Sequence, residues 1–344
     1  MTPHVNRQIQ LANRPVGFPA DSDFRFVESP VPDPGAGRML CRTIYLSLDP
    51  YMRGRMNEGV SYAKGLELGD VMIAETVSQV VESNLDGFSV GDYVLTGGGW
   101  QEFSVSDGGG TRKLDPAQAP ISTAVGVLGM PGLTAYVGLL DIGRPKSGET
   151  VVVSAASGAV GSVVGQIARL KGCRVVGIAG AREKCDYVTR SLGFDACVSH
   201  MSNAFRGELE AACPEGVDVY FENVGGKVFD AVLPLLNTFA RVPVCGRIAH
   251  SNQTVAPSGP DQVPNVMGLV LVRRVMVQGF IVFDHADREP DFLRDVGGWI
   301  RSGELTYRED IVDGLESSVA AFQGLMRGQN FGKLLVRVAD DPTR

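Results

Sequence analysis

Metal-ligating residues are scarce in this sequence. It holds four histidines, and its six cysteines are scattered without a CxxC pair. Catalytic zinc sites need a set of Cys and His ligands, and structural zinc sites commonly use closely spaced cysteines. We therefore expect no metal site. Scattered cysteines are instead typical of reduced thiols in a cytoplasmic protein.

Basic runs and an N-terminal apolar segment are also missing. Asp and Glu (39) outnumber Lys and Arg (32), which gives a net charge of −7 and disfavours a nucleic-acid or anionic-membrane partner. The N-terminal residues lack the apolar region of a signal peptide. The longest uncharged stretch, residues 116–140, is interrupted repeatedly by proline and glycine, so it is a poor transmembrane helix. We expect a cytoplasmic protein.

The chain is long enough for two domains, since 344 residues exceed the usual size of one. Residues 1–120 are rich in short strand patterns, which fall at Met39–Leu46, Val71–Val81 and Asp92–Leu95. Beyond residue 130, strands and helices alternate, with strands predicted at 150–154, 174–179, 196–198 and 217–222 and helices at 158–170 and 183–192. This alternation predicts an α/β domain with a doubly wound parallel sheet. Residues 332–338 form a last strand pattern that we expect to return to the first domain.

A glycine-rich turn lies between the first strand and the first helix of this pattern. It reads Ser154-Ala-Ala-Ser-Gly158-Ala-Val-Gly161 and is a variant of GxGxxG, with Ala156 at the place of the first glycine. Gly158 would let the backbone approach a pyrophosphate, and Gly161 would let the helix pack closely on the strand. The helix N-terminus adds unpaired N–H groups that favour an anion. The turn predicts dinucleotide binding, with packing alone as the alternative.

The end of the second strand of the pattern favours NADP(H) over NAD(H). NAD-specific sites usually place an acidic residue here to bind the ribose 2′-hydroxyl. This sequence has Gly180 at the strand end, followed by Arg182 and Lys184 with Glu183 between them. Two cations would stabilise a 2′-phosphate. The alternative is that both are solvated residues of the first helical turn.

Separated motifs of the chain resemble those of one enzyme family. They are Tyr45–Met56 (YLSLDPYMRGRM), Leu128–Tyr136 (LGMPGLTAY), Val153–Gly165, Lys171–Gly177, Phe221–Gly226 (FENVGG), Val228–Asn237 and Gln329–Lys333 (QNFGK). Together they resemble the zinc-free branch of the medium-chain dehydrogenase/reductase superfamily. Within it, they are most similar to the prostaglandin reductase and alkenal double-bond reductase group, which includes the bacterial NADPH-dependent curcumin reductases.

The resemblance implies a domain organisation, a cofactor and an oligomeric state. A GroES-like, β-rich catalytic domain (1–128, completed by 307–344) would accompany a Rossmann NADP-binding domain (129–306), and homodimers are common. The implied cofactor residues are Gly158, Ala159, Val160 and Gly161 at the pyrophosphate; Lys184 and His200 at the 2′-phosphate; and Asn223, Cys245, Gly246, Ser251, Phe280, Ile281, Val282 and Asn330 along the path to the nicotinamide. His200 replaces a tyrosine that helps hold the 2′-phosphate in some relatives; a loop surface role is the alternative.

The implied reaction transfers a hydride from NADPH to the β-carbon of an apolar α,β-unsaturated ketone or aldehyde. Negative charge then develops on the carbonyl oxygen as an enolate, which needs a hydrogen-bond donor. Relatives carry a tyrosine where this chain has Ser251. Tyr62, Ser251 and His250 are the candidate catalytic residues, and the cofactor ribose hydroxyl is a further candidate donor.

Four side chains are candidates for contact with the substrate: Tyr51, Met52, Tyr62 and Met130. Tyr51, Met52 and Met130 alternatively pack or shape the mouth of the site, where adaptable thioethers would suit an apolar substrate. A surface aromatic is the alternative for Tyr62. Two other functions stay open. One is an NADPH quinone reductase on the same fold, and the other is a non-catalytic NADPH-binding protein, which the missing tyrosine makes conceivable.

Overall fold

The structure is a computed structural model that describes residues 5–59, 61–253 and 261–344. It consists of two compact units, Met1–Gly129 with Glu309–Arg344 and Met130–Arg308. Within the described residues, no helix has the length and apolar character needed to cross a membrane. We describe each unit by itself.

The second unit is built on a six-stranded parallel sheet. Its strand order is β10-β9-β8-β11-β12-β13. The strands are β8 (Thr150–Ser154), β9 (Arg174–Ala179), β10 (Ala196–Ser199), β11 (Val217–Phe221), β12 (Leu236–Val244) and β13 (Met276–Gly279). The chain runs outward from β8 through β9 to β10 and then returns to β11 on the other side of β8. The direction of winding therefore changes between β8 and β11, which is where ligands bind in such sheets.

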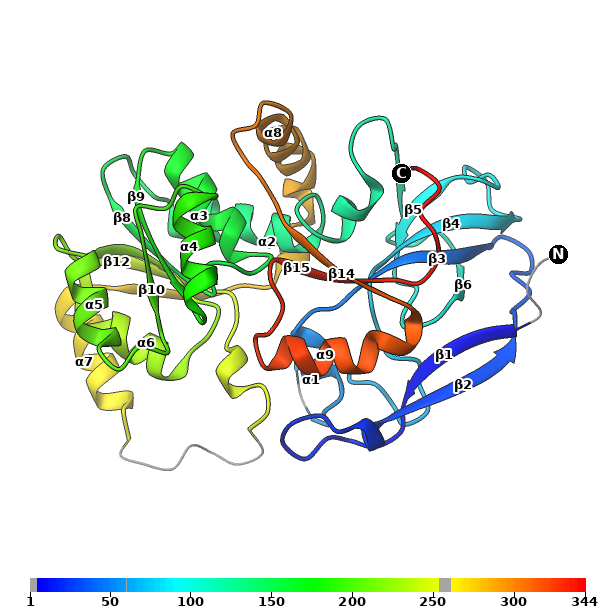
Figure 1. Cartoon of the computed structure of the whole chain (residues 1–344), viewed down its shortest axis with the longest axis horizontal. Helices are drawn as coiled ribbons and strands as arrows, with labels where there is room; N and C mark the ends of the chain where they lie inside the picture. Colours follow the sequence, from blue (N-terminus) through cyan, green and yellow to red (C-terminus); the bar gives the residue numbers. More distant parts are fainter. Residues whose placement is uncertain (1–4, 60, 254–260) are drawn as a thin grey trace. The chain divides into compact units, whose positions relative to one another are not determined.

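Helices cover both faces of this sheet, as right-handed crossovers require. Figure 1 shows α3 (Gly161–Leu170) and α4 (Arg182–Arg190) on one side, and α5 (Phe205–Ala212), α6 (Gly226–Val232) and α7 (Val263–Arg273) on the other. Two further helices of the unit are α2 (Met130–Val137) and α8 (Glu289–Arg301). The sequence prediction of a doubly wound parallel sheet is confirmed.

The helix predicted at residue 158 begins instead at Gly161. Ala155 has a left-handed backbone (φ 51°), and residues 155–160 form a turn in place of the first helical turn. A Cβ on Gly161 would lie 2.4 Å from the carbonyl oxygen of Ala155. Glycine is therefore required where the turn meets the helix.

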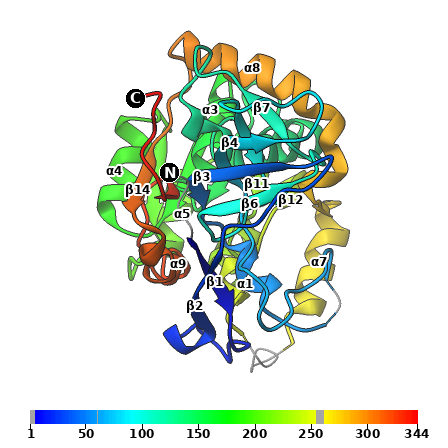
Figure 2. The ribbon, with the colours of Figure 1, turned by 90° about the vertical axis from the view of Figure 1, so that its right-hand side faces the viewer.

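The first unit contains a sheet in the order β14-β15-β3-β4-β5-β7, with β6 also paired to β3. Its strands are β3 (Met39–Ser47), β4 (Thr76–Ser83), β5 (Tyr93–Thr96), β6 (Phe103–Ser106), β7 (Arg112–Leu114), β14 (Glu309–Asp313) and β15 (Lys333–Arg337). β15 pairs antiparallel with β3, which confirms that the last strand returns to the N-terminal part of the chain. Figure 2 shows β1 (Val5–Leu11) and β2 (Phe24–Pro30) as a separate antiparallel pair.

The strand predicted over Val71–Val81 is wrong at its start, because β4 begins at Thr76. Met72 is fully buried and lies in a loop rather than in the sheet. Its N–H donates to the carbonyl of Ile9, and its carbonyl accepts from the N–H of Trp100. These bonds to two distant segments replace the regular pairing that the apolar pattern suggested.

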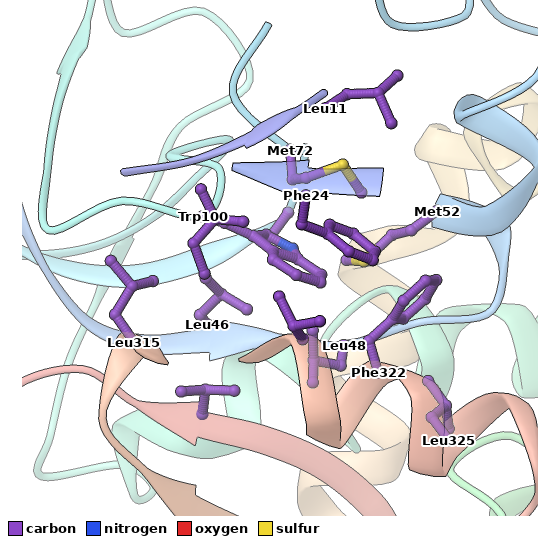
Figure 3. Close-up of a cluster of buried hydrophobic side chains, with 14 of the residues drawn as sticks. Leu11, Phe24, Leu46, Leu48, Met52, Met72, Trp100, Leu315, Phe322 and Leu325 are labelled. Atoms are coloured by element: carbon purple, nitrogen blue, oxygen red, sulfur yellow. The ribbon is translucent and has the colours of Figure 1, made fainter. Parts of the chain in front are cut away.

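An aromatic cluster forms the centre of one core in the first unit. Phe24 stacks on Trp100 with 5.8 Å between ring centroids, and Phe322 from α9 (Ser318–Met326) packs edge-on against both rings. Figure 3 shows these rings with Met52 and the surrounding leucines. This core joins the N-terminal pair of strands to the C-terminal helix, so the first unit needs both ends of the chain.

Candidate cofactor and substrate site

The glycine-rich turn between β8 and α3, which is the candidate phosphate-binding turn, lies directly at the switch point of the sheet. The turn places Ala159 and Val160 at the start of α3, where the first N–H groups of a helix have no partner within the helix. Gly158 has only the carbonyl of Ala155 near its missing Cβ, at 3.2 Å, so the turn is open to an approaching group. The chemistry fits a pyrophosphate, because N–H groups and a positive helix end favour an anion.

Basic side chains gather near the carboxyl ends of β9 and β10. Arg182 begins α4 and is exposed, and Lys184 lies in its first turn. His200 follows β10, and its Nε2 lies 3.5 Å from the position that a Cβ on Gly180 would take. The Nδ1 of His200 is buried and has no hydrogen-bond partner in the described part of the chain. Burial lowers the pKa of His200, and the charges of Lys227 and Lys184 lower it further, so the imidazole is neutral near pH 7.

A cavity of about 320 Å³ adjoins this basic group. Its lining includes His200, Ser202, Arg206 and Lys227. Lys227 lies in the first turn of α6, directly after the FENVGG motif, and the sequence analysis did not identify it as a cofactor residue. Only the fold brings the start of α6 beside the end of β10.

Residues predicted to line the nicotinamide path follow the ends of β11, β12 and β13. The side chain of Asn223 donates to the carbonyl of Ser154, and Gly246 lies against the carbonyl of Asn223. Burial, followed by the charge of Glu222, raises the pKa of the Cys245 thiol to about 12, so this thiol is protonated. Phe280 packs edge-on against Phe221 at 6.4 Å. The segment that continues from it, Ile281 and Val282, is half-buried and buried respectively.

The two catalytic candidates of this unit lie on a short helical turn after β12. The ring of His250 lies against Gly225, where a Cβ would be 2.9 Å from Cδ2, and its Nδ1 is bonded to the side chain of Gln253. Ser251 is half-buried.

The remaining candidates lie in the first unit, except Met130, which begins α2. Burial raises the pKa of both Tyr51 and Tyr62, and the charge of Arg55 lowers both by a smaller amount. The two phenols are neutral near pH 7 and can donate. Tyr62 is 54% exposed, as a substrate-binding side chain in a free protein can be. The Asn330 amide donates to the carbonyl of Gly332.

Met52 has no exposed surface and packs in the aromatic core of Figure 3. The sequence analysis proposed it as a substrate contact because a thioether adapts to apolar ligands. Its position gives it a packing role in the first unit, so the proposal below does not use it.

Comparison with known proteins identifies the family. A model described as the N-terminal domain of oxidoreductase matches residues 7–114, and a zinc-binding dehydrogenase model matches residues 159–296. The chain is 54% identical over 338 residues to NADPH-dependent curcumin reductase of Escherichia coli (strain K12), covering 98% of both chains. It belongs to the medium-chain dehydrogenase/reductase superfamily.

Within this superfamily, the double-bond reductases match over nearly their whole length. The 2-alkenal reductase (NADP(+)-dependent) of Nicotiana tabacum is 40% identical over 344 residues, covering 97% of this chain and 98% of the other. The crystal structure of CurA in complex with NADPH from Vibrio vulnificus has a TM-score of 0.95 and 51% identity, and covers 97% of this chain and all of that one (100%). The family predicted from the motifs is confirmed.

One of the matching models is described as zinc-binding dehydrogenase. In residues 5–59, 61–253 and 261–344, no group of three His, Cys, Asp or Glu side chains is arranged to hold a metal ion.

Proposed function

We propose that this protein is an NADPH-dependent reductase of the carbon–carbon double bond of α,β-unsaturated ketones and aldehydes. The observation that carries the proposal is the phosphate-binding turn at the switch point, with a basic cluster in place of an acidic residue after β9. The relatives named above are reductases of this kind, and they match the chain over nearly its full length. We assign NADPH binding to the unit of residues 130–308 and substrate contacts mainly to the other unit.

NADPH, when bound, supplies the hydride. The turn of residues 158–161 would hold its pyrophosphate, and Lys184 with His200 would hold its 2′-phosphate. Tyr62, Ser251 or His250 would donate a hydrogen bond to the carbonyl oxygen as negative charge develops there, which lowers the energy of the transition state. A proton then reaches the α-carbon from water or from a relay.

The test is the loss of NADPH absorbance when purified protein is mixed with a straight-chain alkenal, an aryl enone such as a curcuminoid, or a simple quinone. Each reaction is repeated with NADH. We expect fast oxidation of NADPH with an enone and a saturated carbonyl product. Fast oxidation with the quinone alone would instead identify a quinone reductase. Binding of NADPH without oxidation by any of the three would identify a binding protein.

Tyr62→Phe is expected to lower kcat about tenfold and to leave the affinity for NADPH unchanged. The Tyr62 side chain has the longest reach of the three catalytic candidates, and its phenol is a neutral donor. Removing one oxyanion donor lowers kcat about 10²-fold or more when no other donor replaces it. The expected loss is smaller here because Ser251 and His250 remain. The measurement is steady-state kinetics with an enone, together with an NADPH titration. An unchanged kcat would move the role to Ser251, His250 or the cofactor ribose.

Replacing His200 by Tyr is expected to remove a pH dependence of NADPH binding. A 2′-phosphate beside the imidazole would raise the pKa of His200 above its lowered value in the free protein, so binding takes up a proton. Affinity of the wild type for NADPH should then rise as pH falls from 7.5 towards 6, while affinity for NADH stays constant. Titrations at several pH values check this. The phosphate's own titration is common to both proteins, so equal pH slopes would contradict the assignment.

We also propose a homodimer that forms through β13 and α7. β13 is the edge strand of the sheet, and Val277 on it is 47% exposed. On α7, apolar residues at helical spacing are exposed: Val263 (63%), Met267 (58%) and Leu271 (77%). An open strand edge beside an apolar helix face suits pairing with a second copy about a two-fold axis.

Val277→Lys is expected to convert the dimer to a monomer in sedimentation equilibrium. The charge would be buried opposite its own copy at a two-fold interface, which is unfavourable. Val90→Lys, at a 67% exposed valine of the first unit, is the matched control and should leave the dimer intact. A monomeric wild type would contradict the proposal.

We place the protein in the cytoplasm, because all six cysteines are free thiols.

A further inference from the structure

Glu222 is a buried carboxylate at the switch point of the sheet. It follows β11 and is 3% exposed. It forms an isolated parallel β-bridge with Val244 at the end of β12. In the described structure, no Lys, Arg or His lies within ion-pair distance of it. The sequence analysis included this residue only as part of the FENVGG motif and assigned no role to it. An acidic residue buried without a cation is costly, so its presence calls for a reason.

Four neutral donors surround the carboxylate. The N–H groups of Val224 and Gly225 donate to Oε1, at 2.5 and 2.9 Å. The hydroxyl of Ser154 lies 3.2 Å from the same oxygen, and the hydroxyl of Tyr220 donates to Oε2 at 2.9 Å. The charge is therefore solvated by fixed dipoles, and no opposite charge cancels it.

The side chain of Glu222 links the end of β11 to Ser154 at the end of β8, and its backbone adds a link to β12. Its N–H donates to the carbonyl of Pro243, and its carbonyl accepts from the N–H groups of Cys245 and Gly246. The residue thus joins the ends of β8, β11 and β12. The attached segments are the phosphate-binding turn, the turn that holds Asn223, and the loop that leads to Ser251.

The charge also acts on its surroundings. After burial itself, Glu222 is the next cause that raises the pKa of both Tyr220 and Cys245. Both groups are neutral near pH 7, so they add no second negative charge. The carboxylate is the single uncompensated charge among these three groups.

We propose that Glu222 is a positioning residue for the cofactor, and that its fixed negative charge favours the oxidised form over NADPH. This inference rests on the proposed function. The nicotinamide ring gains a positive charge when it gives up a hydride, and a carboxylate held in a site of low dielectric stabilises such a charge. NADPH carries no charge on this ring, so the same carboxylate has little effect on it.

The test is Glu222→Gln, with the dissociation constants of NADP⁺ and NADPH measured by calorimetry without substrate. The amide oxygen of Gln can still accept from the two N–H groups and from Ser154, while the charge is gone. We expect the affinity for NADP⁺ to fall about tenfold, equivalent to about 1.4 kcal/mol. The affinity for NADPH should stay within about twofold. Glu210→Gln on α5, at an exposed glutamate of the same unit, is the matched control and should change neither constant.

An equal loss for both cofactor forms would show a purely structural role and overturn the proposal, as would an unchanged ratio. Glu222→Asp provides a second test if the Gln variant does not fold, as judged by near-UV circular dichroism. Asp keeps the charge and shortens the side chain, so both affinities should fall while their ratio stays as in the wild type. A changed ratio in Glu222→Asp would overturn the proposal.

Failure of the proposed function has a different signature. A wild type that binds both cofactor forms but reduces no enone would refute the reductase, while the comparison of NADP⁺ with NADPH would still test Glu222. A wild type that binds neither form would refute both.

Discussion

Lys333→Met is expected to lower the free energy of unfolding of the first unit by about 3–5 kcal/mol. Lys333 lies on β15 and is 4% exposed. Its ammonium donates to Asp49 at 2.6 Å and to the carbonyl of Leu48 at 2.9 Å. Methionine fills a similar volume but leaves the Asp49 carboxylate, itself 6% exposed, without a cation. An uncompensated buried charge is the source of the loss.

The same strand offers a matched control. Arg337, at the other end of β15, pairs with Asp313 at 2.6 Å, but the two side chains are 42% and 68% exposed. Arg337→Met should cost less than about 1 kcal/mol, because water solvates both charges when the pair is lost. The contrast separates burial from the mere presence of an ion pair.

Urea denaturation followed by tryptophan fluorescence measures both variants. The chain has two tryptophans, and Trp100 lies in the core of the first unit. A Trp299→Phe background therefore leaves one reporter in the unit that is perturbed. Adding Asp49→Asn to Lys333→Met should recover part of the stability, since it removes the buried carboxylate charge that has lost its cation. A cost for Lys333→Met no greater than that for Arg337→Met would show that the buried pair is not stabilising.

Lys184→Ala is expected to weaken NADPH binding about 10- to 100-fold and to leave NADH binding unchanged. A charge-assisted hydrogen bond to the 2′-phosphate is worth about 1.5–3 kcal/mol, and NADH has no such phosphate. Calorimetric titration with each cofactor provides the comparison.

Arg190→Ala is the control for this change. Arg190 is exposed at the last turn of the same helix, α4, and should affect neither cofactor. An equal loss of NADPH and NADH affinity in Lys184→Ala would place the lysine elsewhere in the site. The 2′-phosphate would then have to be held by Arg182, Lys227 or His200.

Local sequence determined the strands and the main turn of the second unit. Thr150–Ser154 and Arg174–Ala179 are strands at the predicted residues, because continuous apolar runs of that length suit a strand buried on both faces. The same kind of pattern was misleading at Val71–Val81, where buried residues of a loop look like a strand. Hydrophobic periodicity records burial, and it does not record which backbone partners a segment finds.

The residues of the candidate site also differ in whether local sequence or tertiary packing indicates their role. Gly158, Gly161 and Lys184 could be identified as candidates from the sequence, because a strand–turn–helix pattern and the first residues of a helix are local features. For Met52 the sequence left two roles open, because a thioether suits a ligand and a core equally well, and its burial in the aromatic core favours packing.

The sequence by itself determined the family, the doubly wound sheet and the place of the glycine-rich turn, since each depends on patterns of contiguous residues. Tertiary structure decided what gathers around that turn. Ser154 and Glu222 are 68 residues apart, yet their side chains meet because β8 and β11 are neighbours in the sheet. Lys333 and Asp49 pair across 284 residues because β15 joins the N-terminal sheet. Buried charges depend on partners that are distant in sequence, so their roles become visible only in the folded chain.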